Sequence, residues 1–234
     1  MASKGGKKNQ KRFATPRVRK QKVKEGKWAI RSIPGPFSKK NSIPLGFLLR
    51  DLLGVGRNAR EAKVALGKGL VSVNGRVRKD YRFPIGFFDV VSIEGMEKDY
   101  RLVFDLHGRL EAKEIEKKKK KSKLCRVENK KTTSKGRMQL VTNDGRSIFV
   151  EKKIDLKAGD SIEIELPSQK ILRTLKMEKG AKAFIVGGKH AGEKSVIREI
   201  KPGSLESPRL VKLKAGSKEF ETTAENVFVT GEEN

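Results

Sequence analysis

The sequence predicts a multidomain α+β protein that is mostly β. Short runs in which apolar and polar residues alternate occur along much of the chain, and clusters of turn-forming residues separate them. One stretch near residue 50 instead repeats leucine at helical spacing. The length of 234 residues suits one large domain or two to three small ones.

Changes in pattern divide the chain into four expected segments. Residues 1–41 form a basic N-terminal arm and connector, and residues 42–94 form a small module of helices and a hairpin. Residues 95–175 form a central β domain whose short strands suggest a small barrel or sandwich, and residues 176–234 form a third unit of short strands.

The net charge of +27 indicates a polyanionic partner. The chain has 55 Lys and Arg residues against 28 Asp and Glu residues, far beyond what solubility needs. Such an excess destabilises the fold by self-repulsion, whereas binding to nucleic acid releases the counterions of its phosphates. An anionic membrane is the rival partner, but no apolar run approaches the roughly 18 residues of a membrane span. The start of the chain is also too polar for a secretory signal.

The first 40 residues hold 14 Lys and Arg residues and one acidic residue. With so few apolar side chains this segment should not form a core alone, so it is either a solvated tail or a basic arm that orders on RNA. The interspersed Phe13 and Trp28 favour the arm, in which Trp28 would stack on a base or dock on the next domain. Residues 33–37 read as a rigid connector. The candidate RNA contacts of the arm are Arg12, Arg17, Arg19, Lys20 and Lys22.

Two helices are expected after the connector. Ser42 can cap the first helix, with Pro44 in its first turn. Asn58 and Glu61 have the spacing of a capping box for a second, short helix that Gly67 can end. The buried faces would consist of Leu45, Leu48, Leu49, Leu52 and Leu53 in the first helix, and of Ala59, Ala62 and Leu66 in the second.

Strands and turns are expected in the rest of the chain. Residues 71–77 alternate around an Asn-Gly turn, a strong hairpin signal, and residues 89–93 form a further strand. The Lys-rich block 117–121 is equally well explained as a solvated segment or as a phosphate contact. Further strands and hairpins are expected at residues 100–106 before a turn at Gly108, 138–150, 162–166, 183–186, 196–200, 210–213 and 227–229.

Residues 42–93 resemble the small RNA-binding module of a bacterial ribosomal protein, of some pseudouridine synthases and of tyrosyl-transfer-RNA synthetases. The match lies in Arg60-Glu61-Ala62, in residues 69–75 and in residues 89–91. The resemblance implies that the basic face of the two helices meets folded RNA, where Arg binds phosphate as a planar fork and Lys as a point charge. The candidate contacts are Arg57, Arg60, Lys63, Lys68, Asn74, Arg76, Arg78 and Lys79.

Residues 180–200 resemble a KOW motif, a strand–loop–strand unit shared by ribosomal and transcription proteins. The glycines of its loop, residues 187–192, permit positive φ angles and a close approach of the backbone to RNA. Lys189 and His190 would face phosphate or base, although His190 fits equally well as a turn residue without such a role. This resemblance implies that the C-terminal domain is a KOW/SH3-like barrel.

The order of arm, helix-hairpin module, central β domain and KOW-like unit is similar to the archaeal and eukaryotic small-subunit ribosomal protein family four-e. Phe37 departs from the His expected after Pro-Gly-Pro in this family. The resemblance implies a structural constituent of the cytoplasmic small ribosomal subunit, which binds small-subunit ribosomal RNA and neighbouring ribosomal proteins and supports assembly and translation. The matching segments are residues 34–36, 42–45, 49–51, 84–86, 100–102, 123–125 and 166–168.

No enzymatic role is expected. Cys125 is the only cysteine, and His107 and His190 show no metal-ligand spacing. Residues 54–59 match a dinucleotide-binding pattern but follow a leucine-rich helix where that pattern needs a strand. We therefore expect no catalytic residue, metal, cofactor, small-molecule substrate, membrane contact or homo-oligomer. Two other functions remain open: a non-ribosomal RNA-binding or RNA-modifying accessory protein, and a transcription-associated factor of the KOW type.

Overall fold

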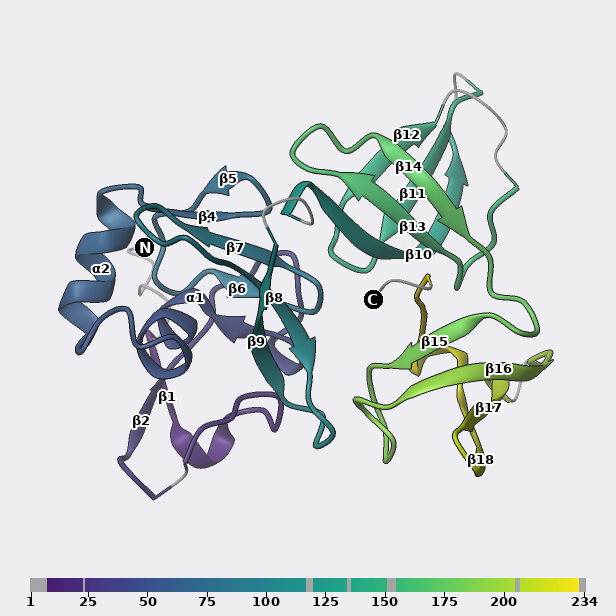
Figure 1. The fold of residues 1–234 in the computed structure, drawn as a ribbon, viewed down its shortest axis with the longest axis horizontal. Helices are drawn as coiled ribbons and strands as arrows, with labels where there is room; N and C mark the ends of the chain where they lie inside the picture. Colours follow the sequence, from purple (N-terminus) through teal and green to yellow (C-terminus); the bar gives the residue numbers. More distant parts are fainter. Residues whose placement is uncertain are drawn as a thin grey trace, which may run out of the picture. The chain divides into compact units, whose positions relative to one another are not determined.

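The structure is a computed structural model that describes residues 8–22, 24–116, 120–133, 136–150, 155–204 and 207–231. The chain divides into two compact units, residues 1–103 with 109–120, and residues 104–108 with 121–234. Among the described residues, short strands predominate and the helices are few, which confirms the mostly β prediction (Figure 1).

The arm is folded into the first unit. β1 (Asn9–Lys11) pairs antiparallel with β2 (Trp28–Ile30), and the backbone N–H of Ile33 donates to the carbonyl of Arg82 at 3.1 Å. This corrects the expectation of a segment that orders only on RNA, because hydrogen bonds to the rest of the unit replace the core that the arm lacks. Residues 1–7 and Val23 of the arm lie outside the described residues.

The first predicted helix begins later than expected. β3 (Ile43–Pro44) pairs with β6 (Pro84–Ile85), and only then does the chain enter α1 (Leu45–Phe47) and the π-helical η3 (Leu48–Leu52). Ser42 therefore does not cap this helix, because the two residues after it are extended in a strand pair. The predicted apolar face is confirmed for Leu45, Leu48 and Leu49, which have no solvent exposure, whereas Leu52 and Leu53 are only partly buried.

The second helix, α2 (Ala59–Gly67), begins at the predicted cap. Asn58 Oδ1 accepts hydrogen bonds from the backbone N–H groups of Arg60 and Glu61 at 2.9 and 3.0 Å. Glu61 Oε2 in turn accepts from the N–H of Arg57 at 2.8 Å. These bonds satisfy donors that the start of a helix otherwise leaves without partners. The buried face of α2 consists of Ala62 and Leu66.

The sheet of the first unit extends beyond the predicted module. The Asn-Gly hairpin is confirmed, since Asn74 and Gly75 have φ angles of 52° and 75°. Val90 of β7 pairs with Arg101 of β8, so the boundary expected at residue 94 falls between two paired strands. Leu106 lies beyond β8 and is exposed. Among the described residues the strand order is β5 (Arg76–Val77), β4 (Val71–Val73), β7 (Val90–Ile93), β8 (Asp99–Phe104) and β9 (Leu110–Ile115).

The described part of the second unit contains two antiparallel sheets. In both, alternate residues are buried, which places one face of each sheet in a core. The first sheet has the order β12 (Ser147–Val150), β11 (Met138–Thr142), β10 (Ser122–Thr132), β13 (Ser161–Glu165) and β14 (Ile171–Leu175). The second has the order β18 (Lys218–Thr223), β17 (Leu210–Ala215), β16 (Lys194–Lys201), β15 (Lys182–Ile185) and β19 (Val227–Val229). Of these strands, β11, β12, β13, β15, β16, β17 and β19 lie within or overlap the predicted runs, whereas β10, β14 and β18 were not predicted.

Candidate nucleic-acid interface

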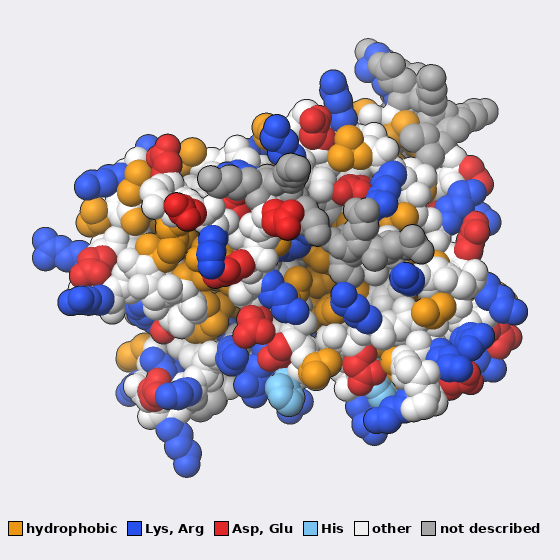
Figure 2. Space-filling model, in the orientation of Figure 1, with side chains coloured by type: hydrophobic (Ala, Val, Ile, Leu, Met, Phe, Trp, Pro, Cys, Tyr) orange, Lys and Arg blue, Asp and Glu red, His pale blue; other side chains and the backbone are white. Residues whose placement is uncertain are grey.

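The predicted cations of the helix-hairpin module mostly face solvent. Figure 2 shows Lys and Arg side chains projecting from the part of the molecule that contains α2. Within the described part of the chain, no carboxylate pairs with the side chains of Arg60, Lys68 or Arg76. Their charge is therefore available to an external anion. The exposed predicted residues of this module are Arg57, Arg60, Lys63, Lys68, Arg76 and Lys79.

Two of the predicted cations lie over aromatic rings of the loop that follows the hairpin. Lys63 Nζ is 5.5 Å from the centroid of the Tyr81 ring, and Arg78 Cζ is 4.4 Å from the centroid of the Phe83 ring. Cation–π attraction limits the positions that these long side chains sample. The structure thus brings α2 and the residues around 78–83 together, although the sequence separates them.

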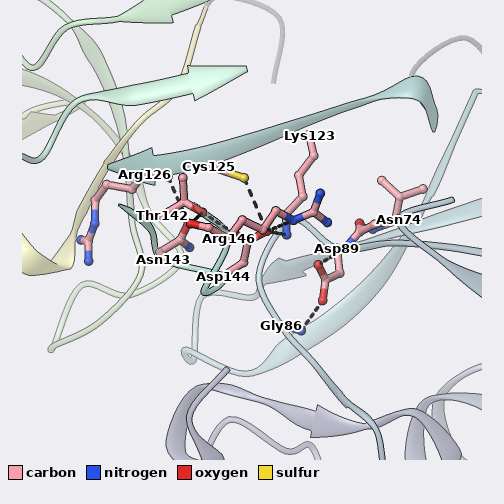
Figure 3. Close-up of polar contacts among 11 residues, drawn as sticks. Asn74, Gly86, Asp89, Lys123, Cys125, Arg126, Thr142, Asn143, Asp144 and Arg146 are labelled. Atoms are coloured by element: carbon pink, nitrogen blue, oxygen red, sulfur yellow. Dashed lines mark hydrogen bonds and ion pairs between the residues drawn. The ribbon is translucent and has the colours of Figure 1, made fainter. Parts of the chain in front are cut away.

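Asn74 has a structural role that differs from the predicted RNA contact. Its side chain is buried, donates from Nδ2 to Asp89 Oδ1 at 2.7 Å and accepts from the backbone N–H of Val90 at 3.0 Å. Asp89 Oδ2 accepts from the N–H of Gly86 at 2.9 Å (Figure 3). We therefore withdraw Asn74 from the RNA surface, because its polar atoms hold the hairpin to the next strand.

Arg19 is also turned into the protein. Its guanidinium is buried and donates to the carbonyl of Ile30 at 2.7 Å and to Ser32 Oγ at 2.9 Å. Burial lowers the pKa of Arg19 to about 10. We withdraw Arg19 from the predicted contacts as well, since both of these bonds fold the arm.

The other predicted residues of the arm differ in whether their side chains have hydrogen-bond or ion-pair partners within the protein. Arg12 donates to the carbonyls of Lys22 and Trp28 at 2.9 and 3.3 Å, which closes the loop between the two arm strands. Lys20 pairs with Glu111 at 3.4 Å, and Lys22 pairs with Glu25 at 2.7 Å. Arg17 is exposed. Trp28 is 55% exposed, so of its two predicted roles the structure favours base stacking over docking on the next domain.

The loop of the KOW-like segment connects β15 to β16. Lys189 is exposed, whereas the ring of His190 stacks on Phe220 with centroids 3.9 Å apart and planes at 13°. His190 Nδ1 also lies 3.4 Å from Glu193 Oε1. Of the two interpretations of His190, these contacts favour the turn residue, because its ring and its Nδ1 atom both contact other residues of the chain.

Two glycines in this loop allow close contact with other residues of the second unit. Gly192 has a φ of 91°, and a Cβ atom there would lie 1.9 Å from the carbonyl oxygen of Asp105. A Cβ at Gly187 would lie 2.5 Å from Asn226 Oδ1. For these two positions the predicted close approach to RNA is replaced by a close approach within the second unit.

The second unit contains a buried polar cluster that was not predicted from the sequence. Lys123 Nζ of β10 lies 2.7 Å from Asp144 Oδ2, in the turn between β11 and β12, and both side chains are almost completely buried (Figure 3). Arg146 Nε and Thr142 Oγ1 also donate to this carboxylate, at 2.8 and 2.5 Å. Burial raises the pKa of Asp144, but Lys123 and Arg146 outweigh it and hold the pKa at about 2. No local sequence pattern links residues this far apart.

Cys125 belongs to the same cluster. Its thiol is buried and donates to Asp144 Oδ2 at 3.6 Å. In the described ranges, no three His, Cys, Asp or Glu side chains are grouped so that they could hold a metal ion. No helix there combines the length and apolar character that crossing a bilayer requires.

The sequence of this chain is similar to those of known proteins. Residues 96–171 match the model of ribosomal family S4e. The small ribosomal subunit protein eS4 of Methanosphaera stadtmanae is 40% identical over 233 residues, which cover 100% of this chain and 96% of the relative. The protein of the same name from Methanothermobacter thermautotrophicus is 38% identical over 234 residues, with 100% and 96% covered.

A solved structure agrees with these sequence matches. The crystal structure of the 30S ribosomal protein S4e from Thermoplasma acidophilum superposes with a TM-score of 0.71 at 33% identity. The match covers 82% of this chain and 96% of that chain. This chain therefore belongs to ribosomal family S4e.

Proposed function

We propose that this chain is a structural constituent of the cytoplasmic small ribosomal subunit, where it binds small-subunit ribosomal RNA and neighbouring ribosomal proteins. The observation that carries the proposal is the full-length match to archaeal proteins named small ribosomal subunit protein eS4. The net charge of +27 supplies the physical basis for holding RNA, since cations neutralise phosphates and release counterions. The role is structural rather than catalytic, and the protein acts as a single copy.

RNA binding in this proposal depends on phosphate contacts that recognise the shape of folded RNA. A-form RNA hides the edges of its bases in a deep, narrow groove, so side chains on a rigid surface meet mainly its backbone. The exposure of the module's cations supports this interpretation. The proposed contacts are Arg12, Arg17, Lys20, Lys22, Arg57, Arg60, Lys63, Lys68, Arg76, Arg78, Lys79 and Lys189.

The domain assignment is part of the proposal. Residues 176–234 would form the KOW/SH3-like barrel, and the strand–loop–strand arrangement of β15 and β16 supports this. The antiparallel order β18-β17-β16-β15-β19 among the described strands is also compatible with a small barrel. Residues 95–175 would contribute the central β domain.

Replacing Arg60 and Lys63 by Ala tests the binding face. Affinity of the full chain for folded small-subunit RNA should fall by roughly tenfold or more, because charge-assisted bonds to phosphate are lost. The slope of log K against log salt should also shrink by roughly 1.4 to 1.8 for two phosphates. The matched control replaces the exposed Lys113 and Lys218. An unchanged affinity in the first variant, with its circular dichroism intact, contradicts this binding face.

The ribosomal role itself is tested by sedimentation of a cell extract in high magnesium. The protein should migrate with small subunits. Residence with the nucleoid or with RNA polymerase would contradict the role and would favour the transcription-associated alternative.

A further inference from the structure

The first unit contains a basic groove that joins the arm to the helix-hairpin module. It has a volume of about 720 Å³ and is lined by Lys8, Asn9 and Ile30 of the arm, by Lys63 of α2 and by residues 79–82. Four of the lining side chains are cationic and one is a carboxylate, so the groove has an excess of three positive charges. Two of the cations, Lys63 and Lys79, are predicted RNA contacts, and the fold adds Lys8 and Arg82 to them.

The single carboxylate does not block the groove. Asp80 Oδ1 accepts a hydrogen bond from the backbone N–H of Arg82 at 2.7 Å, which holds the carboxylate in a local turn. The Arg82 guanidinium approaches it only to 4.0 Å. The positive charges of the groove therefore remain largely available to an anion.

Trp28 lies on the same strand face as one of the residues that line this groove. Residues two apart on a strand share a face, so Trp28 lies on the same face of β2 as Ile30, which lines the groove. The register pairs Asn9 with Ile30 and Lys11 with Trp28, so all four side chains share this outer face. The opposite face of the β1–β2 pair is buried, whereas Trp28 is more than half exposed.

We infer that the groove and Trp28 together bind one unpaired stretch of RNA, with its phosphates on the groove cations and one base stacked on the indole. The inference rests on the proposed function and deepens it. A base inside a duplex already stacks on its neighbours, so only an unpaired nucleotide offers a face to Trp28. An acidic protein segment would satisfy the cations but would leave the indole without a planar partner.

The tryptophan itself reports on the site, because Trp28 is the only tryptophan in the chain. The full chain is titrated with a short oligouridine, which has no structure of its own, and with an abasic oligomer of the same length. Oligouridine should quench the emission of Trp28, while the abasic oligomer should bind more weakly and leave the emission nearly unchanged. The same response to both oligomers, or to neither, overturns the inference.

Substitutions separate stacking from charge. Trp28→Ala should weaken oligouridine binding by roughly 5- to 100-fold, the usual effect of losing one stacked base, as measured by anisotropy of a labelled oligomer. Trp28→Phe should retain most of the affinity, since it keeps an aromatic face. Phe149→Ala, which removes an exposed aromatic ring outside the groove, is the matched control and should change nothing.

The groove charges are tested by salt dependence. Replacing the exposed Lys8 and Lys79 by Ala should reduce the salt slope of oligouridine binding by about 1.4, the value for two single-strand phosphates. Replacing Lys113 and Lys218 should leave the slope unchanged. A slope that does not differ between the two pairs overturns the assignment of the phosphates to this groove.

Folded small-subunit RNA, tested in parallel, distinguishes failure of the groove inference from failure of the proposed function. If the native chain binds folded RNA but Trp28→Ala leaves oligouridine binding intact, the groove inference fails and the proposed function stands. If the native chain does not bind folded RNA, the proposed function fails. Polyglutamate that displaces oligouridine and quenches Trp28 equally well identifies an acidic protein as the partner and overturns the inference.

Discussion

Lys123 and Asp144 form an ion pair that is removed from water inside the second unit. Taking two charges out of water is costly, and good geometry with further hydrogen bonds offsets that cost. Asp144 meets this condition, because Arg146 and Thr142 also donate to its carboxylate. The cluster therefore holds β10 against the turn between β11 and β12 as long as every member is present.

Replacing Lys123 by Met should destabilise the protein strongly. The substitution keeps an apolar stem of similar length but leaves the buried carboxylate without its closest cation, a loss of about 3–5 kcal/mol in the free energy of unfolding. Urea denaturation measures this change. Lys98→Met, in the exposed pair with Glu114, is the control and should barely move the midpoint. Equal midpoints for the two variants would show that the buried pair contributes little.

Stability should fall in acid because of the same carboxylate. Asp144 has a pKa of about 2 in the folded protein against an ordinary value of 3.8, so its contribution is present above pH 3.8 and is lost as the pH falls towards 2. The expected loss between pH 5 and pH 2 is about 2 kcal/mol. Asp144→Asn removes this titration, so its free energy of unfolding should depend less on pH by that amount. Parallel pH profiles for the two proteins would contradict the assignment.

At the scale of elements, the loop between β15 and β16 depends on glycine for packing. Gly192 combines a positive φ with a Cβ position that the Asp105 carbonyl already occupies. Gly216 also has a positive φ, of 60°, but open space lies around its Cβ position. Substitutions at these two glycines therefore distinguish the cost of backbone strain from the cost of steric overlap.

Gly192→Ala should be the more damaging of the two substitutions. Backbone strain alone costs about 1–2 kcal/mol at a left-handed position, which is the expectation for Gly216→Ala. Overlap with Asp105 should add about 1–3 kcal/mol at Gly192. Thermal unfolding of both variants measures the difference, and equal losses would show that the loop moves away from Asp105 without cost.

Elements with a strong local signal were predicted well. The cap at Asn58 and the turn at Asn74-Gly75 lie where expected, because both depend on side chains within three residues of the backbone that they organise. The start of the first helix was predicted wrongly, because Ile43–Pro44 pairs with Pro84–Ile85, about forty residues away. A distant strand partner overrides a local capping preference that is worth only about 1 kcal/mol.

At the scale of the whole molecule, the net charge of +27 gives folding and RNA binding opposite salt dependences. Salt screens the self-repulsion of the free chain over a Debye length of about 10 Å at 0.1 M, so folding becomes more favourable. RNA binding weakens with salt because each counterion released into a more concentrated salt solution gains less entropy.

Raising NaCl from 50 to 500 mM should therefore increase the urea midpoint of the free protein while it lowers the affinity for folded small-subunit RNA. The two measurements use the same protein and buffers. A urea midpoint that falls with salt would show that the surface ion pairs, such as Lys98 with Glu114, outweigh the excess of like charge.

The sequence by itself determined the β-rich class, the helix at Asn58, most strands and the polyanionic partner, because each depends on composition or on residues near one another in the chain. Only the tertiary structure decided which cations face outward. Arg19 and Arg17 look alike in sequence, yet one is buried against Ile30 and Ser32 and the other is exposed. Lys123 is almost completely buried and pairs with Asp144, which the fold brings to it. Burial and pairing depend on contacts between distant residues, which no local pattern encodes.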